Sequence, residues 1–221
     1  MQKIKPQPLF IVFEGIDGAG KTTIIERLKN QLINEELIDN FIFTREPGGY
    51  NNQACETIRA FTHQNLPFFD NLTLAYLYAA SRNEHLLKTI KPALAQQKII
   101  ICDRFVHSSL VYQSDEQTSM QKVYDVNKIT INDFQVDYIF YFKVDAKKAM
   151  QRIALGNQKN RESNFYDQQK RDFYDSLIQK YDLAFEHHYQ PKNKYIIIDA
   201  NKNIDDVYEA TYKQLKAILK A

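Results

Sequence analysis

A short glycine-rich run near the N-terminus constrains the fold of this chain more than any other segment. Residues 15–22 read GIDGAGKT and fit the pattern G-x-x-x-x-G-K-[ST], in which backbone amides curl around a phosphate group. The run follows the apolar stretch Leu9–Glu14, which has the composition of a strand, and it precedes helical spacing of apolar residues from Ile24 to Ile33. The sequence therefore predicts a strand, a phosphate-binding loop and a helix whose positive N-terminal end faces the phosphates.

This loop indicates binding of a nucleoside triphosphate, ATP or GTP. In the pattern, Lys21 reaches the β- and γ-phosphates and the hydroxyl of Thr22 ligates Mg²⁺, so we expect Mg²⁺ as the cofactor. The residues expected to bind ATP are Gly15, Ile16, Asp17, Gly18, Ala19, Gly20, Lys21, Thr22 and Thr23.

Four more short apolar runs alternate with helical patterns along the chain. They span residues 41–44, 99–103, 138–144 and 195–199, and the run at 99–103 is apolar on both faces, as a central parallel strand is. The longest helical pattern covers about residues 72–94, where Pro92 predicts a kink. The last helix begins at Asn203, with Asp206 as its capping partner. This alternation predicts an α/β fold, a parallel sheet with helices on both faces.

The composition excludes several classes of protein. With 221 residues, of which 44% are hydrophobic, the chain can bury a core of its own, and we expect one domain with residues 1–8 as a flexible tail. The 29 basic and 27 acidic residues are balanced, which argues against nucleic acid as a partner. Two cysteines are too few for a disulfide framework or a structural zinc site. Without a membrane-length apolar segment or a signal-peptide pattern, a cytoplasmic protein is expected.

A phosphate-binding loop alone does not define a reaction. The N-K-x-D motif of GTPases is absent, and D-x-x-G does not occur outside the glycine-rich run itself. A small phosphotransferase needs instead basic residues that neutralise two facing phosphate chains. Asp103–Arg104 and Thr44–Gly49 each lie at the carboxyl end of a predicted strand, where parallel sheets bind ligands. Asp103 can hold Mg²⁺ through water, and Arg104 can bridge the two phosphate chains. The alternatives are a surface ion pair and a plain Pro-Gly turn.

Together these segments resemble the thymidylate kinase family. The resemblance covers residues 10–219 and is carried by FEGIDGAGKTT at 13–23, TREPGG at 44–49, DRF at 103–105 and SSLVYQ at 108–113. The stretches YAASR at 78–82 and IKPAL at 90–94 also match. The resemblance implies a P-loop NTPase fold with three α/β/α layers, a five-stranded parallel sheet, a small lid and a homodimer. It also implies Mg²⁺-dependent transfer of the γ-phosphoryl group of ATP to dTMP, giving dTDP and ADP, in dTTP synthesis.

The resemblance further implies a site for dTMP. In it, Arg59 and Arg104 hold the 5′-phosphate, Asp17 lies beside the acceptor, Tyr78 stacks on thymine and Arg82 bonds the carbonyl edge of the base. The whole set implied for dTMP is Arg45, Glu46, Arg59, Tyr78, Arg82, Tyr112 and, for positioning the base, Ser109 and Gln113. Without the resemblance, Tyr78 reads better as a core aromatic, and Arg59 and Arg82 as solvated helix residues.

A catalytic cation is implied in a lid over residues 156–166, which are polar and lack apolar periodicity. Family members with alanine at the position of Ala19 carry this arginine in a D-R-x-E segment. Here NRES at 160–163 supplies Arg161, acting like an arginine finger, and Lys159 or Arg152 could share its role. The catalytic residues implied are Lys21, Arg104, Arg161 and Asp17.

Two other functions stay open on the sequence alone. One is a kinase for another acceptor on the same scaffold, a deoxynucleoside or UMP/CMP. The other is a nucleotide-dependent binding protein that transfers no phosphoryl group. No catalytic role is expected for any of the five histidines.

Overall fold

The computed structural model describes residues 7–132, 134–157, 165–187 and 195–220. Its strands form one five-stranded parallel sheet in the order β2-β3-β1-β4-β5. The strands are β1 (Leu9–Glu14), β2 (Phe41–Arg45), β3 (Ile99–Asp103), β4 (Tyr138–Lys143) and β5 (Tyr195–Asp199). They lie where the apolar runs predicted them, within one residue at each end.

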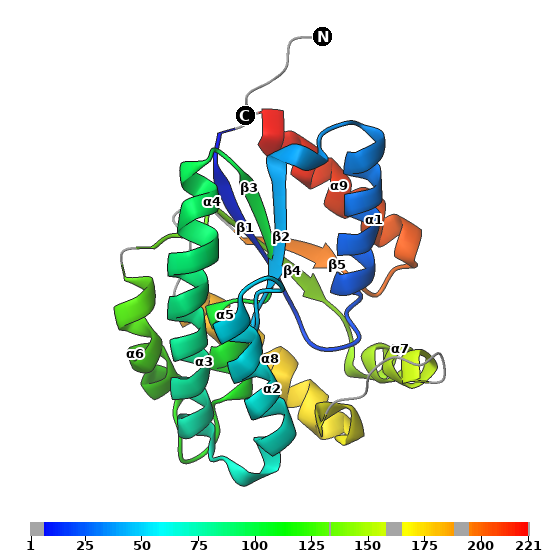
Figure 1. The fold of residues 1–221 in the computed structure, drawn as a ribbon. Helices are drawn as coiled ribbons and strands as arrows, with labels where there is room; N and C mark the ends of the chain where they lie inside the picture. Colours follow the sequence, from blue (N-terminus) through cyan, green and yellow to red (C-terminus); the bar gives the residue numbers. More distant parts are fainter. Residues whose placement is uncertain (1–6, 133, 158–164, 188–194, 221) are drawn as a thin grey trace.

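Helices connect the strands and cover both faces of the sheet, so the predicted three-layer α/β/α fold is confirmed (Figure 1). In Figure 1, α1 and α9 lie together on one side of the sheet, and α3, α5, α6 and α8 lie on the other. The helices are α1 (Lys21–Asn34), α2 (Gln53–Asn65), α3 (Asn71–His85), α4 (Lys91–Ala95), α5 (Val106–Tyr112), α6 (Met120–Ile131), α7 (Ala146–Asn157), α8 (Arg171–His187) and α9 (Ile204–Lys220).

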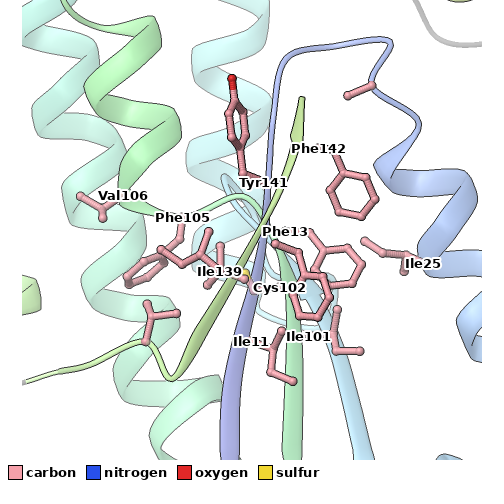
Figure 2. Packing of buried hydrophobic residues seen from close by; sticks show 14 of the residues in the cluster. Ile11, Phe13, Ile25, Ile101, Cys102, Phe105, Val106, Ile139, Tyr141 and Phe142 are labelled. Carbon is pink, nitrogen blue, oxygen red and sulfur yellow. The ribbon is translucent and has the colours of Figure 1, made fainter. Parts of the chain in front are cut away.

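The core lies on both faces of the central strands. Because side chains alternate along a strand, β4 sends Phe142 toward α1, and Ile139 and Tyr141 toward α5, as Figure 2 shows. On the α1 side, the ring of Phe13 lies 5.1 Å from that of Phe142. Both faces of β1 are therefore buried.

The predicted helix over residues 72–94 is one helical run with an irregular middle. It comprises α3, a π-helical segment at Leu86–Ile90, and α4. The break expected near Pro92 is present as this irregular turn, which directly precedes α4, and Pro92 itself lies in the first turn of α4. Proline has no N–H to donate and its ring crowds the carbonyl four residues earlier, and the wider π turn accommodates both effects.

The start of α9 has the predicted cap. The Asn203 side-chain oxygen accepts from the backbone N–H of Asp206 at 2.9 Å, and the Asn203 amide donates to the Asp206 carboxylate at 2.7 Å. These two hydrogen bonds satisfy the backbone N–H of Asp206 in the first turn and join the two side chains. Within the described ranges, no helix has both the length and the apolar character that crossing a bilayer requires.

Candidate active site

The loop after β1 has the conformation that a phosphate-binding loop requires. Gly18 has φ of 78°, and a Cβ atom there would lie 2.4 Å from the backbone oxygen of Ala149, so no other residue fits without moving α7. The loop then runs directly into α1, at Lys21. The first turn of α1 therefore presents its free amides at the end of the sheet.

Lys21 is folded back onto this loop. Its Nζ donates to the backbone oxygens of Gly15 at 2.7 Å and Ile16 at 3.1 Å, and the side chain is buried. Burial, with a smaller contribution from the charge of Arg104, lowers the pKa of Lys21 to about 8. The ammonium group thus lies beside the loop.

A cavity of about 680 Å³ adjoins the loop at the carboxyl ends of β1, β2 and β3. Its volume is in the range of small-molecule sites. All eight residues expected to bind dTMP line it, together with Asp17, Thr22, Asp103 and Arg104. The structure therefore brings together residues from five separate sequence motifs around one cavity.

Four arginines line this cavity, Arg45, Arg59, Arg82 and Arg104, and neighbouring groups hold each of them. Arg45 pairs with Glu56 at 3.0 Å and lies over the ring of Tyr50 at 4.5 Å. Arg59 donates to the backbone oxygen of Pro47 at 3.1 Å. Within the described part of the chain, the buried Nε of Arg45 has no hydrogen-bond partner. Such a concentration of guanidinium groups suits an anionic ligand.

Arg104 lies between the cavity and the phosphate-binding loop. Its backbone is in the left-handed region, with φ of 71°, where a residue other than glycine is uncommon. Its Nη2 donates to Asp17 Oδ1 at 2.7 Å, and its Nη1 donates to the backbone oxygen of Gly15 at 3.0 Å. The side chain is 16% exposed, so one edge remains open to the cavity. Arg104 is thus placed to contact phosphates on either side.

The wall of the cavity includes a buried network around Arg82. Its Nε donates to Glu46 at 2.7 Å, its Nη2 donates to Ser109 at 3.0 Å, and its Nη1 donates to Asn127. On the other side of Glu46, His85 contacts Oε1 at 3.0 Å through Nδ1. Arg82 is 2% exposed, so the alternative of a solvated helix residue is wrong.

Aromatic side chains cover another part of the cavity. Tyr78 is 8% exposed and packs with Leu66 and Leu74, so it is both a core residue and a cavity-lining residue. The ring of Tyr112 lies 5.1 Å from that of Tyr166, a residue to which no sequence motif assigned a role in binding. These flat rings are suited to a planar base.

Comparisons with known proteins agree with this arrangement. A family model described as Thymidylate kinase matches residues 13–211. The chain belongs to the thymidylate kinase family. A thymidylate kinase of Ureaplasma parvum serovar 3 is 48% identical over 215 residues, which cover 96% of this chain and 91% of that protein. One of Ligilactobacillus salivarius is 37% identical over 205 residues, covering 91% and 94%.

The fold is similar to that of a solved member of the family. The crystal structure of thymidylate kinase from Ehrlichia chaffeensis matches with a TM-score of 0.68 at 31% sequence identity, covering 96% of this chain and 100% of that chain. The five-stranded parallel sheet implied by the resemblance is thus confirmed, both by the strand order and by this likeness.

The residues expected to hold Mg²⁺ fit that ion. Asp103 and Thr22 line the same cavity, and both offer oxygen, the ligand atom that Mg²⁺ prefers. Within the described ranges, the buried Oδ1 of Asp103 has no hydrogen-bond partner. A buried carboxylate oxygen without a partner is costly, and a cation or its bound water would satisfy it.

The predicted lid can be compared with the structure only in part. Arg161 and Lys159 lie outside the described residues. Arg152, the other cation considered for this role, donates from Nη1 to the backbone oxygen of Gly18 at 3.4 Å and from Nη2 to that of Lys202 at 3.0 Å. Of these three cations, only Arg152 lies within the described residues, and it contacts the phosphate-binding loop.

The lowered pKa of Lys21 predicts proton uptake when a nucleotide binds above about pH 8. In the free protein the ammonium group loses its proton as the pH rises through about 8, whereas a phosphate beside Nζ favours the charged form and raises the pKa. ATP affinity should therefore fall as the pH rises above that value. Calorimetric titrations at about pH 9, in two buffers with different ionisation enthalpies, measure the uptake.

Lys21→Arg is the control for this prediction, because arginine stays protonated at this pH. The uptake should disappear in the variant. Equal uptake in both proteins would show that another group binds the proton.

Proposed function

We propose that this protein transfers the γ-phosphoryl group of ATP to dTMP, giving dTDP and ADP. The observation that supports this most directly is the position of Arg104, between a phosphate-binding loop and a cavity lined by arginines and tyrosines. A donor phosphate on the loop and an acceptor phosphate in the cavity would both lie within reach of that guanidinium group. In-line transfer needs this juxtaposition.

In the proposed reaction, an oxygen of the dTMP phosphate attacks the γ-phosphorus of ATP. The bond from that phosphorus to the β–γ bridging oxygen breaks, and ADP leaves with the electron pair. Lys21 and Arg104 neutralise the negative charge on the transferred group, and Asp17 orients Arg104. Thr22 and Asp103 would hold Mg²⁺, which would supply further neutralisation of the phosphates when bound. Arg161, in the 156–166 segment, is proposed as the additional cation.

For the acceptor, each role follows the chemistry of the side chain. Arg45, Arg59 and Arg104 would bind the 5′-phosphate, since guanidinium groups pair well with phosphate oxygens. Tyr78 would stack on the thymine ring, and Arg82 would donate to its carbonyl edge. Glu46, Ser109, Tyr112 and Gln113 complete the proposed dTMP site.

A coupled assay of ADP release with several acceptors tests this function. We expect release to depend on dTMP and to be much slower with UMP, CMP or thymidine. A preference for UMP, CMP or thymidine would contradict the acceptor assignment. ADP release that no acceptor stimulates, together with tolerance of Arg104→Ala, would contradict phosphoryl transfer and favour a binding protein.

We also propose a homodimer in the cytoplasm, as the resemblance implies. Large apolar side chains are exposed on the layer that contains α3 and α6: Tyr76 is 60% exposed and Ile129 is 93% exposed. Exposed apolar residues of this size are typical of interfaces between subunits. Sedimentation analysis of the whole chain measures the assembly directly, and a monomer at micromolar concentration would contradict the proposal.

A further inference from the structure

A polar cluster lies beside Arg104, at the edge of the cavity. It consists of Glu14 at the end of β1, Ser108 in α5 and Tyr181 in α8, which are far apart in the sequence. Glu14 and Tyr181 are fully buried. A carboxylate in such a place must be matched closely by hydrogen-bond donors.

Glu14 has these donors. Oε2 accepts from the hydroxyl of Ser108 at 2.7 Å and from that of Tyr181 at 3.0 Å. Oε1 accepts from the backbone N–H of Phe105 at 2.8 Å. Burial raises the pKa of Glu14, and the hydrogen bonds with Ser108, Phe105 and Tyr181 and the charge of Arg104 oppose that rise.

The same two hydroxyl groups also contact Arg104. Its Nη1 lies 3.0 Å from Ser108 Oγ and 3.3 Å from the Tyr181 oxygen. A guanidinium group only donates and an ionised carboxylate only accepts. With Glu14 ionised, a hydroxyl that accepts from Arg104 can donate to Glu14, so Ser108 and Tyr181 both lie in bridging positions between the cation and the buried carboxylate. The two hydrogens of Nη1 are shared among these hydroxyls and the backbone oxygen of Gly15. Chains of this kind polarise and strengthen their hydrogen bonds.

We propose that Tyr181 is a positioning residue for the acceptor phosphate, and that it acts through Arg104. Its hydroxyl bridge to Glu14 fixes Nη1, which leaves Nη2 directed toward Asp17 and the cavity. The packing of α8 on α5 thus sets the place of the guanidinium group. This inference rests on the proposed function, because it takes Arg104 to bind the phosphate of dTMP.

The test removes the hydroxyl alone, by Tyr181→Phe in the full chain, and measures dTMP and ATP binding by calorimetry. We expect dTMP to bind about 10-fold more weakly and ATP affinity to change less than about twofold. In an Arg104→Ala background, the same substitution should change dTMP affinity less than about twofold, because the bridge has no cation to hold.

Tyr141→Phe is the matched control. Tyr141 is buried, its ring is stacked on that of Tyr181 at 5.3 Å, and it lies outside the proposed machinery. The Tyr141→Phe variant should bind dTMP and ATP with the affinities of the parent protein. Ser108→Ala removes the other bridge and gives a second cycle with Arg104→Ala if Tyr181→Phe does not fold.

The outcomes separate this inference from the proposed function. An equal loss of dTMP affinity with and without Arg104 would mean that Tyr181 has a purely structural role, and would overturn the inference while leaving the function intact. If Arg104→Ala itself does not weaken dTMP binding, the assignment of Arg104 to the acceptor phosphate fails as well.

Discussion

Lys21→Met is expected to slow phosphoryl transfer about 10³-fold while the protein remains folded. The Nζ group is buried beside the loop, where the charge it adds to the transition state is poorly screened by water. Methionine keeps the length and apolar character of the side chain, so the loss isolates the charge. Single-turnover measurements with saturating ATP and dTMP separate this chemical step from binding.

Lys128→Met provides the comparison. Lys128 is exposed on α6, and removing its charge should leave the rate within about twofold of the parent. A Lys21→Met rate within about 10-fold of the parent would contradict the role given to Lys21, because removing a buried charge beside the transferred group should slow transfer by more than that.

Arg82→Leu is expected to lower the free energy of unfolding by about 3 to 5 kcal/mol. The substitution leaves Glu46 buried, at 5% exposure, without its charged partner, and it also removes the donors to Asn127 and Ser109. Urea unfolding measures the change through the transition midpoint. Binding of dTMP should weaken in the same variant, since Arg82 lines the cavity.

Arg171→Leu is the matched control for this loss. Arg171 also pairs with a carboxylate, that of Asp175 at 3.3 Å, but the two side chains are 66% and 45% exposed. Removing an exposed pair should cost about 0.5 kcal/mol or less. Similar costs for the two substitutions would show that burial of the Arg82 pair does not matter.

The sequence predicted those parts of the site whose positions follow from short-range sequence patterns. A strand, a glycine-rich loop and a helix define the position of Lys21 locally. The positions of Arg45, at the end of β2, and of Arg104, directly after β3, follow from the rule that parallel strands open their carboxyl ends to one crevice. The resemblance supplied the rest of the dTMP set, and all of it lines the cavity, although the role of each residue stays a prediction.

The partners that hold these residues were not predictable in the same way. Glu56, Asn127 and Tyr181 reach the site from helices whose packing no local spacing specifies. His85 was expected to have no catalytic role, and it contacts Glu46 and Thr44 from within the core. Its position depends on the register of α3 against β2, which is a tertiary property.

One feature of the sequence did indicate that such supporting partners exist. Glu14 is the single charged residue of an otherwise apolar strand. A charged residue is buried in a central strand only where other groups pair or hydrogen-bond with it. Tyr181 gave no such sign, since a tyrosine on the apolar face of a helix is ordinary core material. Arg82 was masked in a similar way, because a basic residue on a helix is usually solvated.

The enclosure of Arg82 has a consequence for selectivity among nucleotides. Four of its five N–H groups are engaged by Glu46, Asn127, Ser109 and the Phe105 carbonyl, so its orientation is set as the chain folds. In the proposed dTMP site, an incoming base would meet a wall that is already ordered, so little entropy would be lost in ordering that wall on binding. Bases of another shape would be excluded by a surface whose form is set before the ligand binds.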